Sequence, residues 1–337
     1  MDDHTPDHSD PSTSAHPFAA LTPDFIMDAV ESRGWRCDGR ILALNSYENR
    51  VYQVGIEDGD PLIAKFYRPG RWSDAQILEE HAFCFELAEQ ELPVVPPLGD
   101  GEGQSLHPFR GQRFSLFMRK GGHAPEIDHG DNLSVIGRFL ARIHRVGERQ
   151  PYRHRPGITL QTHAIDSVER ISNGFMPAEL MPAYSSLTRD LLDLLQQRID
   201  DSGSPRLLRV HGDCHAGNML WRDDHPHFVD FDDSRQAPAI QDLWMLLSGD
   251  RDRQQQQLSQ LIAAYEQFRD FDYGELQLIE VFRSLRILHY SAWLARRWDD
   301  PAFPRSFPWF NTQRYWEEHI LELREQFAAL QEPPLCP

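Results

Sequence analysis

Cysteine is scarce in this sequence of 337 residues, and its four copies form no C-x-x-C pair. Disulfide frameworks and structural zinc sites need more numerous or more closely spaced cysteines, so we expect neither. Long apolar runs are also missing, and the first residues are acidic, unlike the basic start of a signal peptide. These absences predict a cytoplasmic protein that does not bind the membrane.

Positive charge is in deficit as well. Lys and Arg number 34 against 52 Asp and Glu, which gives a net charge of −18. This excess would repel phosphate backbones, so we expect neither nucleic acid nor an anionic membrane as a standing partner. ATP is still possible as a ligand, because Mg²⁺ and a lysine can neutralise its charge locally.

The length allows one large domain or two moderate ones, with enough chain for a substantial core. Residues 1–17 are polar, contain proline and lack periodicity, so we expect a disordered tail there. Thr22-Pro23-Asp24 then predicts the start of a helix, and its apolar residues should dock on the lobe that follows.

A sheet is predicted in the first third of the chain. Strand-like runs cover Arg40–Tyr47, Arg50–Ile56, Leu62–Tyr67 and Arg113–Met118, with a further hairpin expected around Gly99–Gly111. A helix with acidic and apolar sides is predicted from about Ser73 to Gln90.

The remainder is predicted to be mostly helical. Helical periodicity covers residues 133–146, 177–200, 252–269, 272–298 and 312–331. Residues 147–175, rich in Pro, His and Arg, are expected to form a long irregular connection. Residues 299–310 form an aromatic, proline-rich loop that we expect to pack across its lobe.

One stretch in the helical part carries chemistry. His211–Asn218 (HGDCHAGN) follows an apolar run, and Phe228–Asp232 (FVDFD) is predicted to be a short strand that ends in acids. A hairpin between these two segments would bring Asp213, Asn218 and Asp230 together at one end of the hairpin. Phosphoryl transfer needs a carboxylate to orient the hydroxyl nucleophile, and an amide and a carboxylate as oxygen ligands of Mg²⁺.

This pair of motifs resembles the aminoglycoside phosphotransferase and choline kinase branch of the protein-kinase-like fold. The resemblance implies an α+β fold of two lobes, an N-terminal antiparallel sheet with a helix and a larger, mostly helical C-terminal lobe. Two departures from protein kinases, Gly212 in place of Arg and Asp232 in place of Gly, are usual in this branch. We expect the N-lobe over residues 18–118, the hinge over 119–124 and the C-lobe over 125–332.

The resemblance also implies roles for residues. Asp213 would accept or orient the proton of the hydroxyl, and Asp230, the main ligand, would hold Mg²⁺ with Asn218. Asp242 would brace the catalytic loop, and His211 would be structural. His215 could also brace the loop.

Lys65, in Ile63-Ala64-Lys65-Phe66, resembles the strand lysine that contacts the α- and β-phosphates of ATP. Its ion-pair partner would be Glu80, with Glu79 as the second choice. No G-x-G-x-x-G loop covers the phosphates, so Ser46 and nearby backbone N–H groups would contact them instead.

Longer strings resemble the RdoA family of bacterial stress-response kinases over nearly the whole chain. They include Asn45–Tyr52 (NSYENRVY), Lys65–Arg71 (KFYRPGR) and Gln76–His81 (QILEEH). This resemblance implies a cytoplasmic serine/threonine protein kinase that uses ATP and Mg²⁺, phosphorylates itself and other proteins, and acts in stress responses. No feature fixes the oligomeric state; we expect a monomer.

Three alternatives remain open from the residues. A small-molecule kinase acting on an amino alcohol, homoserine or an antibiotic would share every catalytic residue. A metallohydrolase could use the alternating His211, Asp213 and His215. This alternative leaves Asn218, Asp230 and Lys65 unexplained. A nucleotide-binding scaffold without activity is the third.

Overall fold

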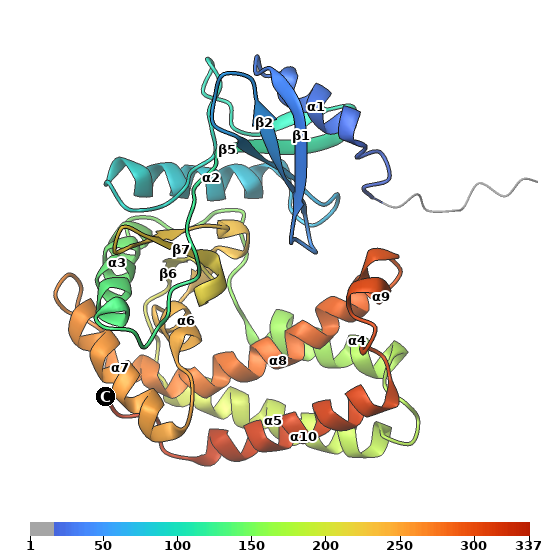
Figure 1. The fold of residues 1–337 in the computed structure, drawn as a ribbon. Helices are drawn as coiled ribbons and strands as arrows, with labels where there is room; N and C mark the ends of the chain where they lie inside the picture. The colour runs from blue at the N-terminus through green and yellow to red at the C-terminus, as the bar shows by residue number, and fades with distance from the viewer. Residues whose placement is uncertain (1–16) are drawn as a thin grey trace, which may run out of the picture.

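The computed structural model describes residues 17–337 and has two lobes (Figure 1). The expected tail over residues 1–17 therefore lies, apart from Pro17, outside the described residues. In the upper lobe, five antiparallel strands form one sheet in the order β1-β2-β3-β5-β4. They are β1 (Cys37–Leu44), β2 (Arg50–Ile56), β3 (Leu62–Phe66), β4 (His107–Phe109) and β5 (Gln112–Met118).

Helix α1 (Pro23–Glu31) covers this sheet, as predicted. The Thr22 side chain accepts a hydrogen bond from the backbone N–H of Phe25 at 3.2 Å, and proline fills the first helical position. Phe25 and Ile26 are buried with Val54 and Phe66 of the sheet in one apolar cluster. This small core stabilises the upper lobe.

Helix α2 (Asp74–Glu89) lies between the two lobes (Figure 1). Ser73 and Gln76 form a reciprocal capping box that fixes its start. Its buried residues Phe83 and Leu87 belong to the core of the lower lobe, not to that of the sheet. The helix therefore couples the lobes through apolar packing.

The lower lobe is mostly helical, as predicted. After the extended segment that follows β5, α3 opens this lobe and packs mainly against α7. The longer helices are α3 (Asn132–Gly147), α4 (Asp166–Gly174), α5 (Met181–Asp201), α7 (Arg251–Tyr265), α8 (Ile279–Arg296) and α10 (Gln313–Gln331). Short strands β6 (Leu208–Val210) and β9 (Arg235–Ala237) pair, as do β7 (Met219–Arg222) and β8 (His225–Phe228).

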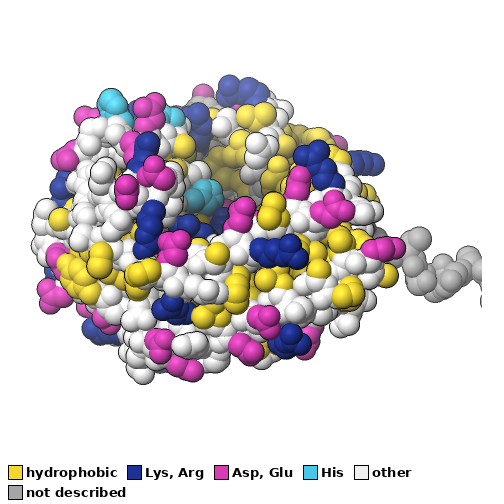
Figure 2. Space-filling model, turned by 90° about the horizontal axis from the view of Figure 1, so that it is seen from below, with side chains coloured by type: hydrophobic (Ala, Val, Ile, Leu, Met, Phe, Trp, Pro, Cys, Tyr) yellow, Lys and Arg dark blue, Asp and Glu magenta, His cyan; other side chains and the backbone are white. Residues whose placement is uncertain are grey.

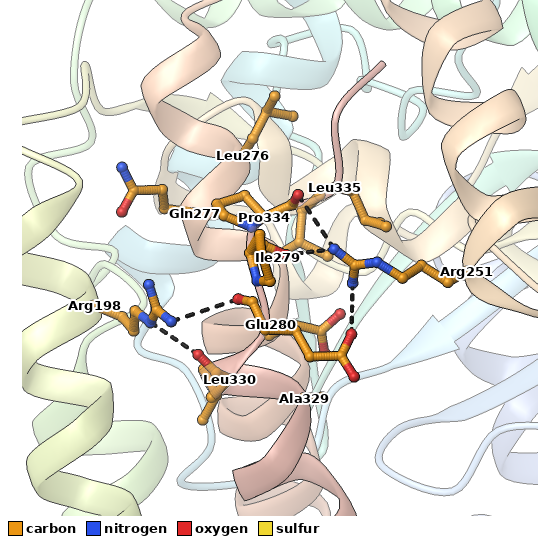
Figure 3. Close-up of a pocket in the computed structure, with 12 residues that line it drawn as sticks. Arg198, Arg251, Leu276, Gln277, Ile279, Glu280, Ala329, Leu330, Pro334 and Leu335 are labelled. Carbon is orange, nitrogen blue, oxygen red and sulfur yellow. Dashed lines mark hydrogen bonds and ion pairs between the residues drawn. The ribbon is translucent and has the colours of Figure 1, made fainter.

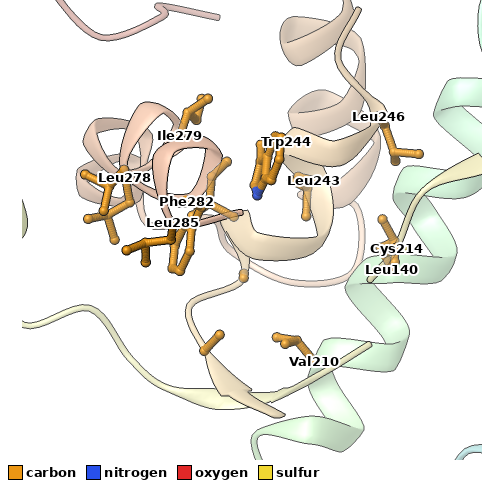
Figure 4. Close-up of a cluster of buried hydrophobic side chains, with 14 of the residues drawn as sticks. Leu140, Val210, Cys214, Leu243, Trp244, Leu246, Leu278, Ile279, Phe282 and Leu285 are labelled. Atoms are coloured by element: carbon orange, nitrogen blue, oxygen red, sulfur yellow. The ribbon is translucent and has the colours of Figure 1, made fainter. Parts of the chain in front are cut away.

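One apolar cluster supports the strand β6, which leads into the His211–Asn218 motif. Leu140 of α3, Val210 of β6 and Cys214 are buried with residues of α8 such as Leu285 (Figure 4). Cys214 is completely buried, so it acts as a small core residue beneath the loop.

The expectation of an irregular connection over residues 147–175 was wrong for its second half. A π-helical turn covers Gln161–Ile165 and leads directly into α4. Ile171, which is buried, and Val168 lie at helical spacing and pack into the lower core. The surrounding Arg, His and Pro residues masked this apolar stripe in the sequence.

Smaller differences concern element ends. The helix predicted over residues 272–298 is divided into a 3₁₀ segment (Tyr273–Leu278) and α8, and residues 299–310 contain the short helix α9 (Ala302–Ser306). Within residues 17–337, no helix combines the length and the apolar character that crossing a bilayer requires. Seen from below, acidic and basic side chains alternate with apolar patches around a hollow (Figure 2).

Candidate active site

Asp242 fixes the start of the His211–Asn218 loop. Its Oδ2 accepts a hydrogen bond from the backbone N–H of His211 at 2.7 Å, and its Oδ1 accepts one from Gly212 at 2.8 Å. The Nε2 of His144 lies 3.0 Å from the same Oδ2. All three partners of this completely buried carboxylate are fixed, so Asp242 has the bracing position that the resemblance implied.

Gly212 is required at this bend. Its φ is +87°, and a Cβ there would lie 2.1 Å from the carbonyl oxygen of Asp233. The backbone can therefore pass close to the second acidic segment only without a side chain.

His211 joins the two acidic segments. Its Nε2 donates to the carbonyl oxygen of Val229 at 2.9 Å, and its ring lies 4.4 Å from that of Phe231. Val229 directly precedes Asp230, so this bond sets the position of Asp230 relative to Asp213. The contact fits the structural role expected for His211.

Asp213 and Asn218 are brought together by the loop. The Nδ2 of Asn218 donates to the carbonyl oxygen of Asp213 at 2.9 Å and to its Oδ2 at 3.1 Å. Since both bonds use the amide nitrogen, the amide oxygen of Asn218 remains available for a cation. The contact leaves Asn218 able to serve as a metal ligand.

The Asp213 carboxylate has two further partners. His215 Nε2 lies 3.4 Å from Oδ2, and Arg286 Nη1 lies 2.5 Å from Oδ1. Burial alone would raise the pKa of Asp213, but the hydrogen bond from His215 and the charge of Arg286 hold it well below its usual range. Asp213 is thus ionised at neutral pH, as a proton acceptor must be.

The second acidic segment differs from the predicted strand. Strand β8 ends at Phe228, and Asp230 adopts a left-handed conformation with φ of +60° and ψ of +62°. The β7–β8 turn itself consists of Asp223 and Asp224, both with positive φ, as a two-residue hairpin turn of type I′ requires. Leaving the strand exposes 55% of the Asp230 side chain, so its oxygens can reach a ligand.

Lys65 reaches this acidic segment from the sheet. Its Nζ lies 2.8 Å from Asp230 Oδ1 and 3.3 Å from Asp232 Oδ1, and its side chain is almost completely buried. Burial would lower the pKa of Lys65, but these two carboxylates raise it well above its usual value. A permanent positive charge therefore stands at the junction of the two lobes.

The expected Lys65–Glu80 ion pair is replaced by other direct contacts. The Glu80 Oε2 lies 3.4 Å from Arg155 Nη2, although its charge still acts on Lys65. Burial raises the pKa of Glu80 to about 7, partly offset by Lys65 and Arg155. Lys65 takes Asp230 and Asp232 as its partners because both acids project from the lower lobe at the end of its side chain.

Glu79, the second choice, has a different function. Its carboxylate accepts backbone hydrogen bonds from Arg153, His154 and Arg155 at 2.7 to 2.9 Å. It therefore fixes the first half of the 147–175 connection to α2.

Arg155 was not identified from the sequence. Its Nη1 donates to the carbonyl oxygens of Asp232 and Ser234 at 2.8 and 2.9 Å, and its Nε donates to Gln76 at 2.7 Å. It holds α2 and the acidic segment together. No local sequence pattern predicts these contacts, because Arg155 lies in a Pro- and His-rich stretch far in sequence from its partners.

Ser46 lies in the β1–β2 turn. Its Oγ donates to the carbonyl oxygen of Asn49 at 3.2 Å, which closes the turn without glycine. The neighbouring Glu48 accepts bonds from Trp293 Nε1 at 2.5 Å and Arg297 Nη2 at 2.6 Å, both on or just after α8. This turn is therefore attached to the lower lobe, which the sequence did not predict.

Oxygen donors fit a hard cation at this site. The Asp230 carboxylate and the Asn218 amide oxygen are the ligand types that Mg²⁺ prefers, and Mg²⁺ keeps several waters and phosphate oxygens in its shell. Over residues 17–337 no cluster of three His, Cys, Asp or Glu side chains forms a metal site made by protein alone. This absence gives no support to the metallohydrolase alternative.

A separate pocket lies at the C-terminal end of the described chain. Arg251 pairs with Glu332 at 3.0 Å and bonds Pro334, while Arg198 bonds the carbonyl oxygen of Leu330 at 2.9 Å (Figure 3). None of the predicted site residues lines it. These contacts fasten the chain end onto the lower lobe.

Comparisons with known proteins agree with this geometry. A family model described as "Phosphotransferase enzyme family" matches residues 40–279. The chain is 45% identical to stress response kinase A of Escherichia coli (strain K12), over 96% of this chain and 98% of that protein. It is 44% identical to the serine/threonine protein kinase RdoA of Salmonella typhimurium, over 96% and 97%.

Solved structures show the same fold at low identity. An amicoumacin kinase in complex with AMP-PNP and Ca²⁺ superposes with a TM-score of 0.71 at 17% identity, over 92% of this chain and 94% of that one. A microcompartment-associated aminopropanol kinase gives a TM-score of 0.66, also at 17% identity, over 90% and 96%. At these identities the likeness shows the two-lobed kinase-like fold alone.

Proposed function

Because this chain belongs to the phosphotransferase enzyme family, we propose that it transfers the γ-phosphoryl group of ATP to serine and threonine hydroxyls. The acceptors are proteins, including the chain itself, in a bacterial stress response. The observation that carries this proposal is the paired geometry of Asp213 with Asn218 and of Lys65 with Asp230. His211 connects the two pairs through Val229.

Each residue has a defined task in the proposed reaction. Asp213 accepts the proton of the hydroxyl, because its carboxylate is ionised and partly exposed. Lys65 neutralises the α- and β-phosphates, and Ser46 with its turn contacts the phosphates from the upper lobe. Positioning and charge stabilisation supply most of the rate enhancement in such reactions.

Asp230 and Asn218 are the residues that would hold Mg²⁺, with Asp230 as the main ligand. When bound, the ion neutralises phosphate charge that builds up during transfer. Glu80 acts indirectly, through its charge near Lys65 and its contact with Arg155.

Proteins are favoured as acceptors by the relatives that share 44–45% identity over nearly the whole chain, one of which is named a serine/threonine protein kinase. The alternative is a small alcohol, and the fold shared with an amicoumacin kinase and an aminopropanol kinase supports it. Both alternatives use the same catalytic residues, so only the acceptor separates them.

The proposal includes the organisation of the chain. We place the N-lobe over residues 18–118, the hinge over 119–124 and the C-lobe over 125–332, in a cytoplasmic monomer. The backbone pairing of His123 with Trp221 of β7 supports a hinge that ends against the catalytic hairpin.

Transfer of labelled γ-phosphate tests this function. Purified protein should label itself and a generic basic protein on serine or threonine when ATP and Mg²⁺ are present. Asp213→Ala should remove most of the turnover, by roughly 10³-fold, and still bind ATP. Asp230→Ala should lose both activity and Mg²⁺-dependent ATP binding.

Labelling of an amino alcohol, homoserine or an antibiotic without labelling of any protein would select the small-alcohol alternative. ATP binding without transfer to any acceptor would leave the scaffold as the explanation. Asp230→Ala that keeps full Mg²⁺-dependent binding would contradict its assignment as the main ligand.

A further inference from the structure

Arg286 lies at the reacting end of the site, on α8. Its Nη1 contacts Asp213 Oδ1 at 2.5 Å, and about half of its side chain (48%) is exposed. Among residues 17–337 this is the only hydrogen bond that its side chain makes. A guanidinium has five N–H donors, so most of those on Arg286 remain open toward solvent at the mouth of the site.

The catalytic loop itself has no cation of this kind. His211–Asn218 contains neither Lys nor Arg. Other guanidiniums near the acidic segment are already engaged: Arg71 with Asp232 and Asp233, Arg155 with two carbonyl oxygens and Glu80, and the largely buried Arg235 with Asp233. Arg286 is therefore the cation beside Asp213 that keeps free donors.

Its position can be bounded relative to the reacting atoms. A general base must lie within about 2.6–3.2 Å of the oxygen whose proton it takes. The Arg286 nitrogen is 2.5 Å from Asp213 Oδ1, so it lies within about 6 Å of the acceptor oxygen when Oδ1 takes the proton. The transferring phosphoryl group must contact that same acceptor oxygen.

We propose that Arg286 is a further catalytic residue, which holds Asp213 and donates hydrogen bonds to the transferring phosphoryl group. The inference rests on the phosphotransferase function proposed above and adds a residue to it. The acceptor oxygen forms a bond to the γ-phosphorus, and its proton passes to Asp213. The bond from the γ-phosphorus to the bridging oxygen breaks, and its electron pair leaves with ADP.

During this step, negative charge lies on the equatorial oxygens of the phosphoryl group. An arginine supplied from another element can stabilise such charge, with effects of about 10³–10⁵ in kcat where it has been measured in other phosphotransferases. Here α8 supplies the arginine within the same chain. The hydrogen bond to Asp213 already holds the Arg286 guanidinium in position when the reaction begins. Little movement of the side chain is then needed during transfer.

The test compares Arg286→Ala, Arg286→Lys and the matched control Arg283→Ala. Arg283 lies one turn earlier on α8 and contacts Gln254 and Glu280 instead of the site, so its loss removes the same charge elsewhere. Kinetics with ATP, Mg²⁺ and a protein acceptor give kcat and the KM for ATP. Each assay is repeated with added guanidinium ion, and melting temperatures report folding.

We expect kcat of Arg286→Ala to fall by about 10²–10⁴, with the KM for ATP within about threefold. Added guanidinium should restore part of this activity, and Arg286→Lys should keep more of it than alanine. Arg283→Ala should stay within about threefold of the natural protein. Recovery by a free guanidinium ion is a response that a purely structural role would not produce.

Two results would overturn the inference while the proposed function stands. One is transfer by Arg286→Ala within about tenfold of the natural protein. The other is a loss that guanidinium does not relieve in a variant whose melting temperature is unchanged. If the natural protein and Arg283→Ala transfer no phosphate to any acceptor, the proposed function fails and the inference fails with it.

Discussion

Two regions face the proposed phosphate site, and they are held in different ways. The first is the proposed catalytic hairpin, residues 211–233. Hydrogen bonds among its own residues and to Asp242, which lies shortly after it in the sequence, hold most of it in place. The β1–β2 turn, residues 45–49, is fixed by side chains that follow it by about 250 residues. The Glu48 carboxylate accepts hydrogen bonds from Trp293 and Arg297 in the lower lobe.

Further contacts strengthen this second attachment. Arg68 bonds Asp300 at 2.8 Å, and the ring of Tyr47 lies 4.7 Å from that of Phe307. We call these contacts the clasp: Tyr47, Glu48 and Arg68 above, and Trp293, Arg297, Asp300 and Phe307 below. In Figure 1 the β1–β2 hairpin reaches down toward α9, where the clasp lies.

The two halves of the proposed site are therefore positioned by different contacts: the hairpin by contacts within one lobe, and the turn by contacts between the lobes. The contacts that set the Asp213 end of the hairpin, from Asp242, Val229 and Asn218, all lie within the lower lobe. The β1–β2 turn, which has no glycine loop and is proposed to contact the phosphates, is attached through Glu48 to the lower lobe. Changes in the hairpin should therefore affect the chemical step, and changes in the clasp should affect nucleotide binding.

The largest effect is expected from Asp242→Ala. The change leaves two backbone N–H groups and His144 without their buried partner, which costs about 3 kcal/mol of the free energy of unfolding. The loop that carries Asp213 then loses its fixed start, so kcat should fall by about 10²–10³. Chemical denaturation and steady-state kinetics measure the two effects.

Asp193→Ala, an exposed acid on α5, is the matched control and should change neither quantity measurably. Asp242→Asn can still accept one of the hydrogen bonds. Its losses of kcat and of the free energy of unfolding should lie between those of Asp242→Ala and Asp193→Ala. A fully active Asp242→Ala would show that the hairpin does not need this brace.

An intermediate effect is expected from Glu48→Gln, which breaks the clasp. Glu48 also pairs with Arg68 Nε at 3.3 Å, and an uncharged amide cannot compensate the charges of Arg297 and Arg68 in this largely buried site. We therefore expect the free energy of unfolding to fall by about 1–3 kcal/mol. The KM for ATP should rise by about tenfold, while kcat changes less. Glu57→Gln, at the exposed β2–β3 turn, is the control.

If Glu48→Gln lowers kcat and leaves the KM for ATP unchanged, the assignment of the clasp to nucleotide binding is wrong. Equal effects of Glu48→Gln and Glu57→Gln would mean that loss of an acid in this lobe, rather than the clasp, is responsible.

The same difference explains what the sequence could predict. Asp213, Asn218 and Asp230 lie within 18 residues, so their spacing and the hairpin between them indicated their proximity. Glu48, Arg155 and Arg286 depend on partners far along the chain, which no local pattern reveals. The Glu80 prediction illustrates the limit: α2 was predicted, but the competing carboxylates Asp230 and Asp232 decide the partner of Lys65.

Helix α2 lies between the two lobes and gives the smallest predicted effect, a dependence of stability on pH. Burial raises the pKa of Glu80 to about 7 in the folded protein, from an ordinary value of 4.5. The folded state thus keeps a proton that the unfolded state releases between these pH values. The contribution to stability is complete below about pH 4.5 and is lost as the pH rises through about 7.

Glu80→Gln should therefore reduce the fall in melting temperature between pH 5 and pH 8. Glu275, whose pKa burial also raises to about 7, should supply the fall that remains. The control is Glu86→Gln in the same helix, because hydrogen bonds from Arg209 outweigh burial and lower the pKa of Glu86. Its contribution is lost only at lower pH, so the change should lower the melting temperature evenly over this range. An unaltered pH dependence in Glu80→Gln would show that Glu80 is ionised in the folded protein at pH 5, as a direct partner of Lys65 would be.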